Sequence, residues 1–296
     1  LGVRVSNLEK KVGNISWNGD ARMRYTASSL KDKKDIYDGR IRLNVKGQVN
    51  DATYVQGQFV NNMNFKDEAS SNTTMAQIYV NHNFNKNVAV RLGRQPIVFG
   101  NQGGWQYNGL EGYDGAQASY NNGKLALTTG FGQLNASDWE DVTHKVGDKV
   151  VVDSYGVTGT DMYFAKGAYD FGFAKLGADY IKFQGDTNST DHYFAGQELY
   201  GINLTIPVQK FNVFGEYWKN TTTGDYEYDT AWNAGLSYGK ADWKKAGTWD
   251  LSVAYNDVDA GAYFGGGTWH NDMLKNLNNS KYIEADNLTF WTAIAN

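Results

Sequence analysis

The stretch ISWNGDARMRYT, residues 15–26, alternates between apolar or small side chains and polar ones. Trp17, Met23 and Tyr25 share one parity, and the other parity is polar or charged throughout. Because successive side chains of a β-strand point to opposite faces, this pattern predicts a strand with one apolar and one polar face. The stretch RIRLNVKGQV, residues 40–49, repeats the pattern. Each stretch has about the ten residues that a tilted strand needs to cross a bilayer core.

The period of two continues to the end of the chain, in segments of varying regularity. It predicts fourteen strands, of which residues 15–26 and 40–49 belong to the first two. The other twelve begin near Thr53, Thr74, Asn87, Tyr113, Lys124, Thr160, Phe173, Gln197, Lys210, Asp229, Thr248 and Ala285.

The predicted connections alternate strictly between short turns and long loops. The turns are 50–51, 85–86, 121–123, 170–172, 208–209 and the slightly longer 241–247. The loops are 27–38, 65–73, 96–112, 133–159, 184–196, 220–228 and 257–284. Such sorting is typical of a transmembrane antiparallel up-and-down β-barrel, with turns toward the periplasm and loops outside. A soluble sandwich has long Greek-key connections at both ends, and no repeat of the kind found in propellers is present.

Composition excludes other classes of protein. The chain of 296 residues has 15% aromatic residues, 34 Gly, 2 Pro and no Cys. Its mean hydropathy of −0.57 and the lack of any apolar run near ~18 residues exclude a bundle of transmembrane helices. A net charge of −4 excludes a strongly basic surface, so no nucleic-acid partner is expected. Composition alone leaves open an aromatic-rich soluble β-protein such as a sugar-binding sandwich.

The polar faces of the strands carry clustered cations. They are Arg22, Arg24, Arg40, Arg42, Lys46 and Arg91. Several cations on one face would be very unfavourable in a dry core, so we expect them to line a wide, water-filled lumen. The apolar faces are then expected to contact lipid, with aromatic residues at the strand ends forming interfacial girdles.

The front end has a different period. Leu1, Val5, Leu8 and Val12 follow the a/d spacing of a coiled coil, and Gly13-Asn14 then ends the helix. We therefore expect residues 1–14 to be the end of a coiled-coil stalk and residues 15–296 to be the barrel domain. A chance pattern on a short capping helix is the alternative, since so short a helix is marginal alone.

The third long connection, 96–112, is the candidate constriction of the lumen. Its expected residues are Gly103, Gly104, Tyr107, Glu111 and the nearby Asp114. The glycines allow the tight backbone that an inward fold needs, and the acids could face the cationic wall. Opposed charges would create a transverse field that sets ion preference. An ordinary surface loop is the alternative.

Taken together, the helical seam, the segment 13–25 and LGRQP at residues 92–96 resemble the OmpM-type porins of diderm Firmicutes, and less closely cyanobacterial porins. The resemblance implies a trimeric channel for small hydrophilic solutes and ions in the bacterial outer membrane. It also implies a peptidoglycan-binding N-terminal domain, of which this sequence holds no residue. Barrels of that family are expected to have sixteen strands, so the resemblance implies that a last hairpin is missing after Asn296.

Other functions have weaker support. The four histidines (82, 144, 192 and 270) have no metal-ligand spacing, and no nucleophile elbow or phosphate loop occurs, so no enzyme, metal or cofactor is expected. A triad assembled only in space remains an alternative. A mainly structural tether and a substrate-specific channel are two further alternatives. In the latter, Tyr79, Phe214 and Trp218 could form an aromatic track for sugars.

Overall fold

The structure is a computed structural model of residues 1–296. It describes residues 13–27, 35–65, 71–101, 104–134, 142–146, 149–153, 160–184, 196–222, 229–242, 244–259, 261–263 and 287–296, with backbone alone at 71–72, 110–111, 142–146, 149–153 and 160. The expected stalk seam of Leu1, Val5, Leu8 and Val12 lies outside these residues. No helix among the described residues is long and apolar enough to span a membrane. The chain divides into two compact units, Leu1–Gln95 and Pro96–Asn296.

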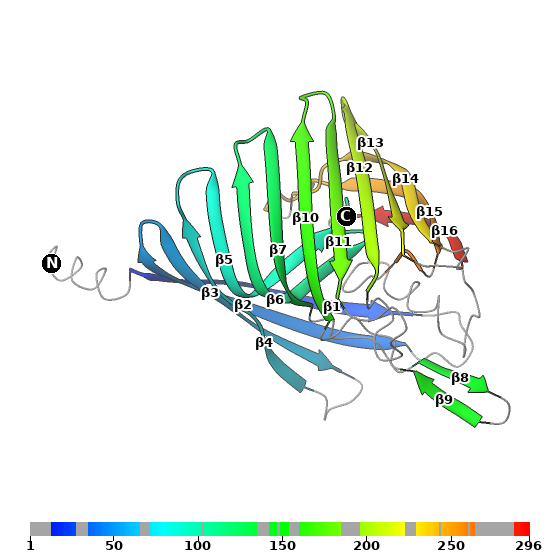
Figure 1. Ribbon diagram of the computed structural model, residues 1–296, viewed down its shortest axis with the longest axis horizontal. Helices are drawn as coiled ribbons and strands as arrows, with labels where there is room; N and C mark the ends of the chain where they lie inside the picture. The colour runs from blue at the N-terminus through cyan, green and yellow to red at the C-terminus, as the bar shows by residue number, and fades with distance from the viewer. Residues whose placement is uncertain are drawn as a thin grey trace, which may run out of the picture. The chain divides into compact units, whose positions relative to one another are not determined.

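The first unit is a meander of antiparallel strands (Figure 1). Its strands are β1 (Ile15–Thr26), β2 (Ile36–Asn50), β3 (Thr53–Asn64), β4 (Ser71–Asn83) and the larger part of β5 (Val88–Phe99). In the register of β1 with β2, Asp20 lies opposite Arg42, Arg22 opposite Arg40 and Arg24 opposite Asp38. The alternation of the sequence therefore places all these charged side chains on one face.

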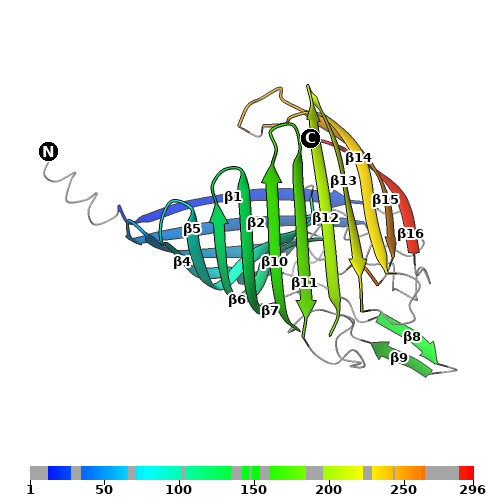
Figure 2. The same ribbon diagram turned by 45° about the horizontal axis from the view of Figure 1, so that its top comes forward.

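The second unit continues the up-and-down pattern. Its strands are β6 (Tyr107–Asn121), β7 (Leu125–Leu134), β10 (Thr160–Asp170), β11 (Lys175–Phe183), β12 (Glu198–Val208), β13 (Phe211–Asn220), β14 (Thr230–Gly239), β15 (Asp250–Asp259) and β16 (Asn287–Ala295). Figure 2 shows β10 to β16 side by side in chain order. Between β7 and β10, β8 (Val142–Val146) and β9 (Lys149–Asp153) form a separate two-stranded sheet.

The fourteen strands of the main sheet correspond to the fourteen predicted ones, which confirms the all-β, up-and-down fold. The largest boundary error concerns the third long connection. β5 continues to Phe99 and β6 already begins at Tyr107, so the third connection is 100–106 rather than 96–112. Gly109 and Gly112 interrupt the alternation there, so the sequence looked like a loop. Gly112 has a positive φ of 51°, which glycine adopts readily within the strand. The hairpin of β8 and β9 was also missed inside the predicted loop 133–159.

Loop lengths are sorted less strictly than predicted. The ends of the strands joined by 51–52, 84–87, 122–124, 171–174, 209–210 and 240–249 are called the turn side, and the opposite ends the loop side. The turn-side connection 240–249 is longer than the loop-side connections 65–70 and 100–106. The β12–β13 turn lies at 209–210 instead of 208–209. Gln209 there has φ 57°, the left-handed conformation that two-residue hairpin turns require.

In most strands of the second unit the inner face is buried toward the loop side, and the opposite face is exposed. The exposed face carries aliphatic side chains between two rows of rings. The loop-side row is Phe131, Tyr163, Tyr180, Tyr200, Tyr217, Trp232, Tyr255 and Trp291; the turn-side row is Tyr169, Phe171, Phe173, Phe211, Tyr238 and Trp249. Several neighbouring rings touch within each row, as at Tyr180–Tyr200 (centroids 4.9 Å apart) and Phe211–Tyr238 (4.8 Å). The rows lie about six residues apart on β10, β13, β14 and β15, or ~20 Å along a strand.

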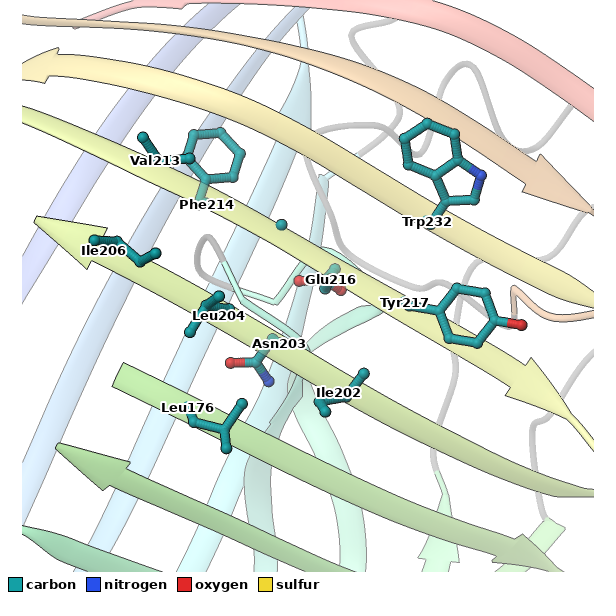
Figure 3. A pocket seen from close by; sticks show the side chains of 11 residues that line it. Leu176, Ile202, Asn203, Leu204, Ile206, Val213, Phe214, Glu216, Tyr217 and Trp232 are labelled. Atoms are coloured by element: carbon teal, nitrogen blue, oxygen red, sulfur yellow. The ribbon is translucent and has the colours of Figure 1, made fainter. Parts of the chain in front are cut away.

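A shallow depression of about 500 Å³ interrupts the aliphatic band where Gly215 of β13 has no side chain (Figure 3). Leu176, Ile202, Leu204 and Val213 line it, and Trp232 closes its loop side. The exposed face is thus apolar even where it is hollow.

The inner face of the second unit holds a packed apolar core toward the loop side. Phe164 of β10 lies at its centre, with ring centroids 5.6 Å from Phe99 and 5.4 Å from Tyr113, both in edge-to-face contact. The other large members are Trp105, Tyr107, Leu134, Met162, Ile181, Phe183, Leu199 and Trp218, all almost fully buried. Such burial accounts for most of the packing energy of this unit.

Candidate functional site

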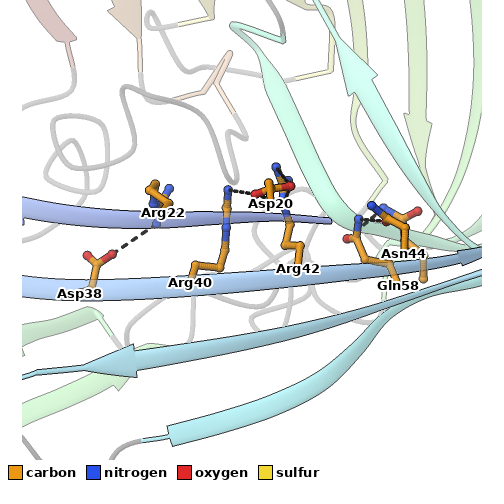
Figure 4. A network of polar contacts seen from close by, with 8 residues as sticks. Asp20, Arg22, Asp38, Arg40, Arg42, Asn44 and Gln58 are labelled. Carbon is orange, nitrogen blue, oxygen red and sulfur yellow. Dashed lines mark hydrogen bonds and ion pairs between the residues drawn. The ribbon is translucent and has the colours of Figure 1, made fainter. Parts of the chain in front are cut away.

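The inner face of the first unit brings four of the predicted cations together, and Figure 4 shows three of them, Arg22, Arg40 and Arg42. Arg22 and Arg24 both pair with the carboxylate of Asp38, at 3.4 and 2.8 Å. Arg40 and Arg42 both pair with Asp20, at 3.9 and 2.8 Å. The four arginines and two aspartates form a cluster, called here the arginine ladder, with a formal charge of about +2.

All six side chains of the arginine ladder are partly exposed, with 17–49% of their surface accessible. Exposed ion pairs contribute little to stability, so their main physical effect is to set the potential near the wall. Asp20 and Asp38 were not among the predicted site residues, although both have the polar parity of their strands. Their effect depends on cross-strand register, which alternation does not specify.

Uncharged polar residues extend this wall toward the turn side. The Asn44 amide donates to Asn18 at 2.8 Å and accepts from Gln58 at 2.7 Å, and Gln77 donates to Gln58 at 3.3 Å. Beyond them, the Lys46 ammonium lies 4.1 Å from the centroid of the Tyr54 ring. A chain of amides and cations therefore crosses β1 to β4.

Arg91, the last of the predicted cations, lies on β5. Its guanidinium carbon is 4.5 Å from the centroid of the Tyr79 ring, in cation–π geometry. Tyr79 is itself buried. Because Arg91 covers that ring, Tyr79 does not present an open face of the kind proposed for stacking a sugar.

The connection 100–106 lies against inner-face residues of the second unit. The Gly100 N–H donates to Asp179 at 3.3 Å, and the Asn101 N–H donates to Glu216. Further along, the Trp105 indole donates to Asn256 Oδ1 at 2.9 Å. Hydrogen bonds to β11, β13 and β15 thus hold this segment against the inner face of the second unit.

Gly104, Tyr107 and Asp114 of the predicted constriction are fully described. Gly104 is buried with φ 96°, and Val98 and Tyr107 lie so close that a Cβ there would clash. Tyr107 is a buried core residue of β6 instead of a loop residue, and Asp114 is a partly buried residue of β6. Gly103 and the side chain of Glu111 lie outside the described residues.

Two buried carboxylates, neither of them among the predicted site residues, anchor the segment. Glu216 accepts the Asn101 N–H on one oxygen and the Trp218 indole N–H on the other, at 3.0 Å. Asp179 accepts the Gly100 N–H and lies 4.0 Å from the ammonium of Lys166, which also donates to the Val98 carbonyl. A lone acid at an inner position of a mostly apolar strand is the signal that could have revealed them.

Comparisons with known proteins agree with this architecture. No protein-family model and no curated protein matches the sequence. Among solved structures, Pseudomonas putida OprB aligns over 87% of this chain and 77% of its own, with 12% identity and a TM-score of 0.52. Vibrio cholerae OmpT, an outer membrane protein, aligns over 95% and 98%, with 15% identity and a TM-score of 0.48. A mutant of Rh. blastica porin aligns over 82% and 94%, with 15% identity and a TM-score of 0.42.

The likeness to OprB confirms the expected fold. The chain has the antiparallel up-and-down fold of outer-membrane β-barrel porins. At 12% identity the likeness concerns the fold alone. The solutes that pass and the oligomeric state depend on this chain's own residues.

Proposed function

We propose that the chain forms a passive channel in the bacterial outer membrane, through which small hydrophilic solutes and ions diffuse. One observation carries the proposal: the strands of the second unit expose an aliphatic band between two aromatic rows, and the strands of the first unit carry a face of charged and amide side chains. Leu127, Ile202, Leu236 and Trp291 are exposed among many other large apolar residues. In water so extensive an apolar surface would aggregate, whereas the aromatic rows suit the two interfaces of a membrane.

The arginine ladder gives this channel a wall of positive potential. Fixed charges act over about 8–10 Å at physiological salt, so ions that pass within that distance respond to the ladder. With a formal charge of about +2, and with Lys46 and Arg91 nearby on the first unit, the wall favours anions and anionic groups of solutes. In this proposal Gly103, Gly104 and the rest of the segment 100–106 narrow the lumen, with Glu111 and Asp114 as acids near it.

The assembly of the chain is also proposed. The Leu1/Val5/Leu8/Val12 seam needs partner helices to bury its apolar side chains, which favours a homo-oligomer, and the resemblance to OmpM-type porins favours a trimer. A tether to peptidoglycan, which the same resemblance favours, would act through a further, peptidoglycan-binding domain. The mass of the intact protein in mild detergent tests the trimer, and a single protomer would contradict it.

Single-channel recording in a planar bilayer tests the channel and its wall together. The wild type should conduct, and the change of Arg22, Arg24, Arg40 and Arg42 to Gln should shift the reversal potential in a salt gradient toward cations. Changing four exposed turn-side lysines to Gln removes the same charge elsewhere and should shift it far less; these are Lys86, Lys124, Lys210 and Lys245. A folded wild type without conductance would overturn the channel, and equal shifts in both variants would overturn the role of the ladder.

A further inference from the structure

A polar pocket of about 280 Å³ lies on the inner face of the second unit, toward the turn side. Strands β13 to β16 form its floor, and Trp105 of the connection 100–106 forms one wall. Its polar lining consists mainly of amides and hydroxyls, those of Asn212, Asn233, Ser237, Ser252, Asn256 and Thr292. At this size it falls at the lower end of the volumes of small-molecule sites.

Asn233 of β14 is the unusual member of this lining. Its side chain is 3% exposed, yet neither its Oδ1 nor its Nδ2 has a hydrogen-bond partner among the described residues. A buried amide left without partners is costly, and native structures rarely contain one without a water or ligand to satisfy it. The amide therefore offers donors and an acceptor to whatever occupies the pocket.

The cross-strand neighbours of Asn233 make their hydrogen bonds with other groups. In the register of the sheet Asn233 lies between Glu216 on β13 and Asn256 on β15. Glu216 accepts the Asn101 N–H and the Trp218 indole. Asn256 accepts the Trp105 indole at 2.9 Å and donates to the Phe290 carbonyl and the Thr292 hydroxyl at 3.4 and 3.3 Å.

The apolar walls of the pocket are held in place. The hydrogen bond to Asn256 fixes the indole of Trp105. The ring of Phe214 occupies space over Gly235, where a Cβ would come within 2.5 Å of it. The pocket thus has polar groups and ring surfaces in fixed positions, which lowers the entropy lost on binding.

Charge in the pocket is balanced and confined to its turn-side end. Lys240 and Asp250 are the charged members of its lining, one of each sign. Asp250 already accepts hydrogen bonds from the Ala241 N–H and the Asn296 amide, both at 2.9 Å. A charged solute would lose hydration at Asn233 without gaining a counter-charge there, which disfavours it relative to a neutral one.

We propose that this pocket is a binding site for a small, uncharged, polyhydroxylated solute of the sugar class, held by the amide of Asn233. Vicinal hydroxyls can both donate and accept, which matches the paired donor and acceptor of an amide and the hydroxyls of Ser237 and Ser252. The ring surfaces of Trp105 and Phe214 cover the less polar part of such a solute. This inference rests on the proposed channel and names a solute class for it.

The test measures block of the single-channel current by D-glucose in a planar bilayer. The wild type should show saturable block, and Asn233→Ala should raise the half-blocking concentration about tenfold, since up to two hydrogen bonds are lost. Asn233→Leu, which keeps the volume but not the amide, should do the same. Asn203→Ala is the matched control, because Asn203 is an inner-face asparagine of β12 that does not line the pocket. Glucose should block this variant at the same concentration as the wild type.

The outcomes separate this inference from the channel itself. Normal conductance with no saturable block by glucose, or with equal block in the wild type and both Asn233 variants, would overturn the site and leave the channel intact. Block by urea that depends on Asn233 as strongly as block by glucose would overturn the solute class. Absence of conductance in folded wild type would instead overturn the proposed function.

Discussion

The inner face of the first unit and that of the second unit place their polar groups in opposite environments. In the arginine ladder every charged side chain is partly exposed and paired with another charged side chain. In the second unit Asp179 and Glu216 are buried and accept backbone N–H groups of the segment 100–106. Exposed pairs set a potential at little gain in stability, whereas buried, hydrogen-bonded carboxylates fix a segment in place. The same alternation of inward and outward side chains can therefore place charged groups on an exposed wall or bury a carboxylate that anchors the segment 100–106.

The largest expected effect is on the aromatic core of the second unit. Phe164→Ala should lower the free energy of unfolding by about 3–5 kcal/mol, because its ring is 2% exposed and packs on Phe99 and Tyr113. Denaturant unfolding from lipid vesicles measures this. Phe173→Ala, which removes a ring that is 72% exposed in the β10–β11 turn, is the control and should change stability far less. Similar losses in both variants would contradict a packed core on this inner face.

A smaller effect is expected at the anchor. In Glu216→Gln the new NH₂ group must face one of the two N–H donors, so the variant should lose about 1–3 kcal/mol of stability. Its chymotrypsin cleavage at Trp105 should also become faster, because the segment 100–106 is released. Glu198→Gln is the control, since that carboxylate pairs with Lys182 in a partly exposed position. If neither stability nor cleavage changes in Glu216→Gln, the carboxylate does not hold the segment.

The smallest effect on stability, and a diagnostic one on selectivity, is expected at the aspartates of the ladder. Changing Asp20 and Asp38 together to Asn removes two negative charges from the wall. The reversal potential should shift toward anions, by about half the size of the shift from the four arginine changes and with the opposite sign. The control is Asp51→Asn with Asp242→Asn, in two turns. A shift toward cations, or no shift at normal conductance, would show that the arginine ladder does not lie beside the ion path.

The candidate site was only partly predictable. The arginines were found because four cations recur at same-face positions of two consecutive strands. Asp20 and Asp38 were visible on that same face, but their pairing depends on the register Asp20–Arg42 and Asp38–Arg24, which the hairpin sets in three dimensions. Asn233 left no signal at all, because an unpaired amide is a property of its surroundings and not of its residue type.

The aromatic core was hidden for a different reason. In β10, Met162 and Phe164 point inward, while Tyr163 and Ala165 lie on the exposed face. Both faces of this strand are apolar near the loop side, so alternation alone assigns neither to lipid nor to core. The short boundary errors at 96–112 arose because glycines break the period without breaking the strand.

By itself, the sequence determined the number and order of the strands in the main sheet and the division of most of them into an apolar and a polar face. These follow from local alternation, and antiparallel neighbours in a meander need only short-range pairing. Only the tertiary structure decided which polar groups are paired, which are buried and which are left open. That depends on register, on where the segment 100–106 packs and on the cavity left at Asn233, all of which involve residues far apart in the chain.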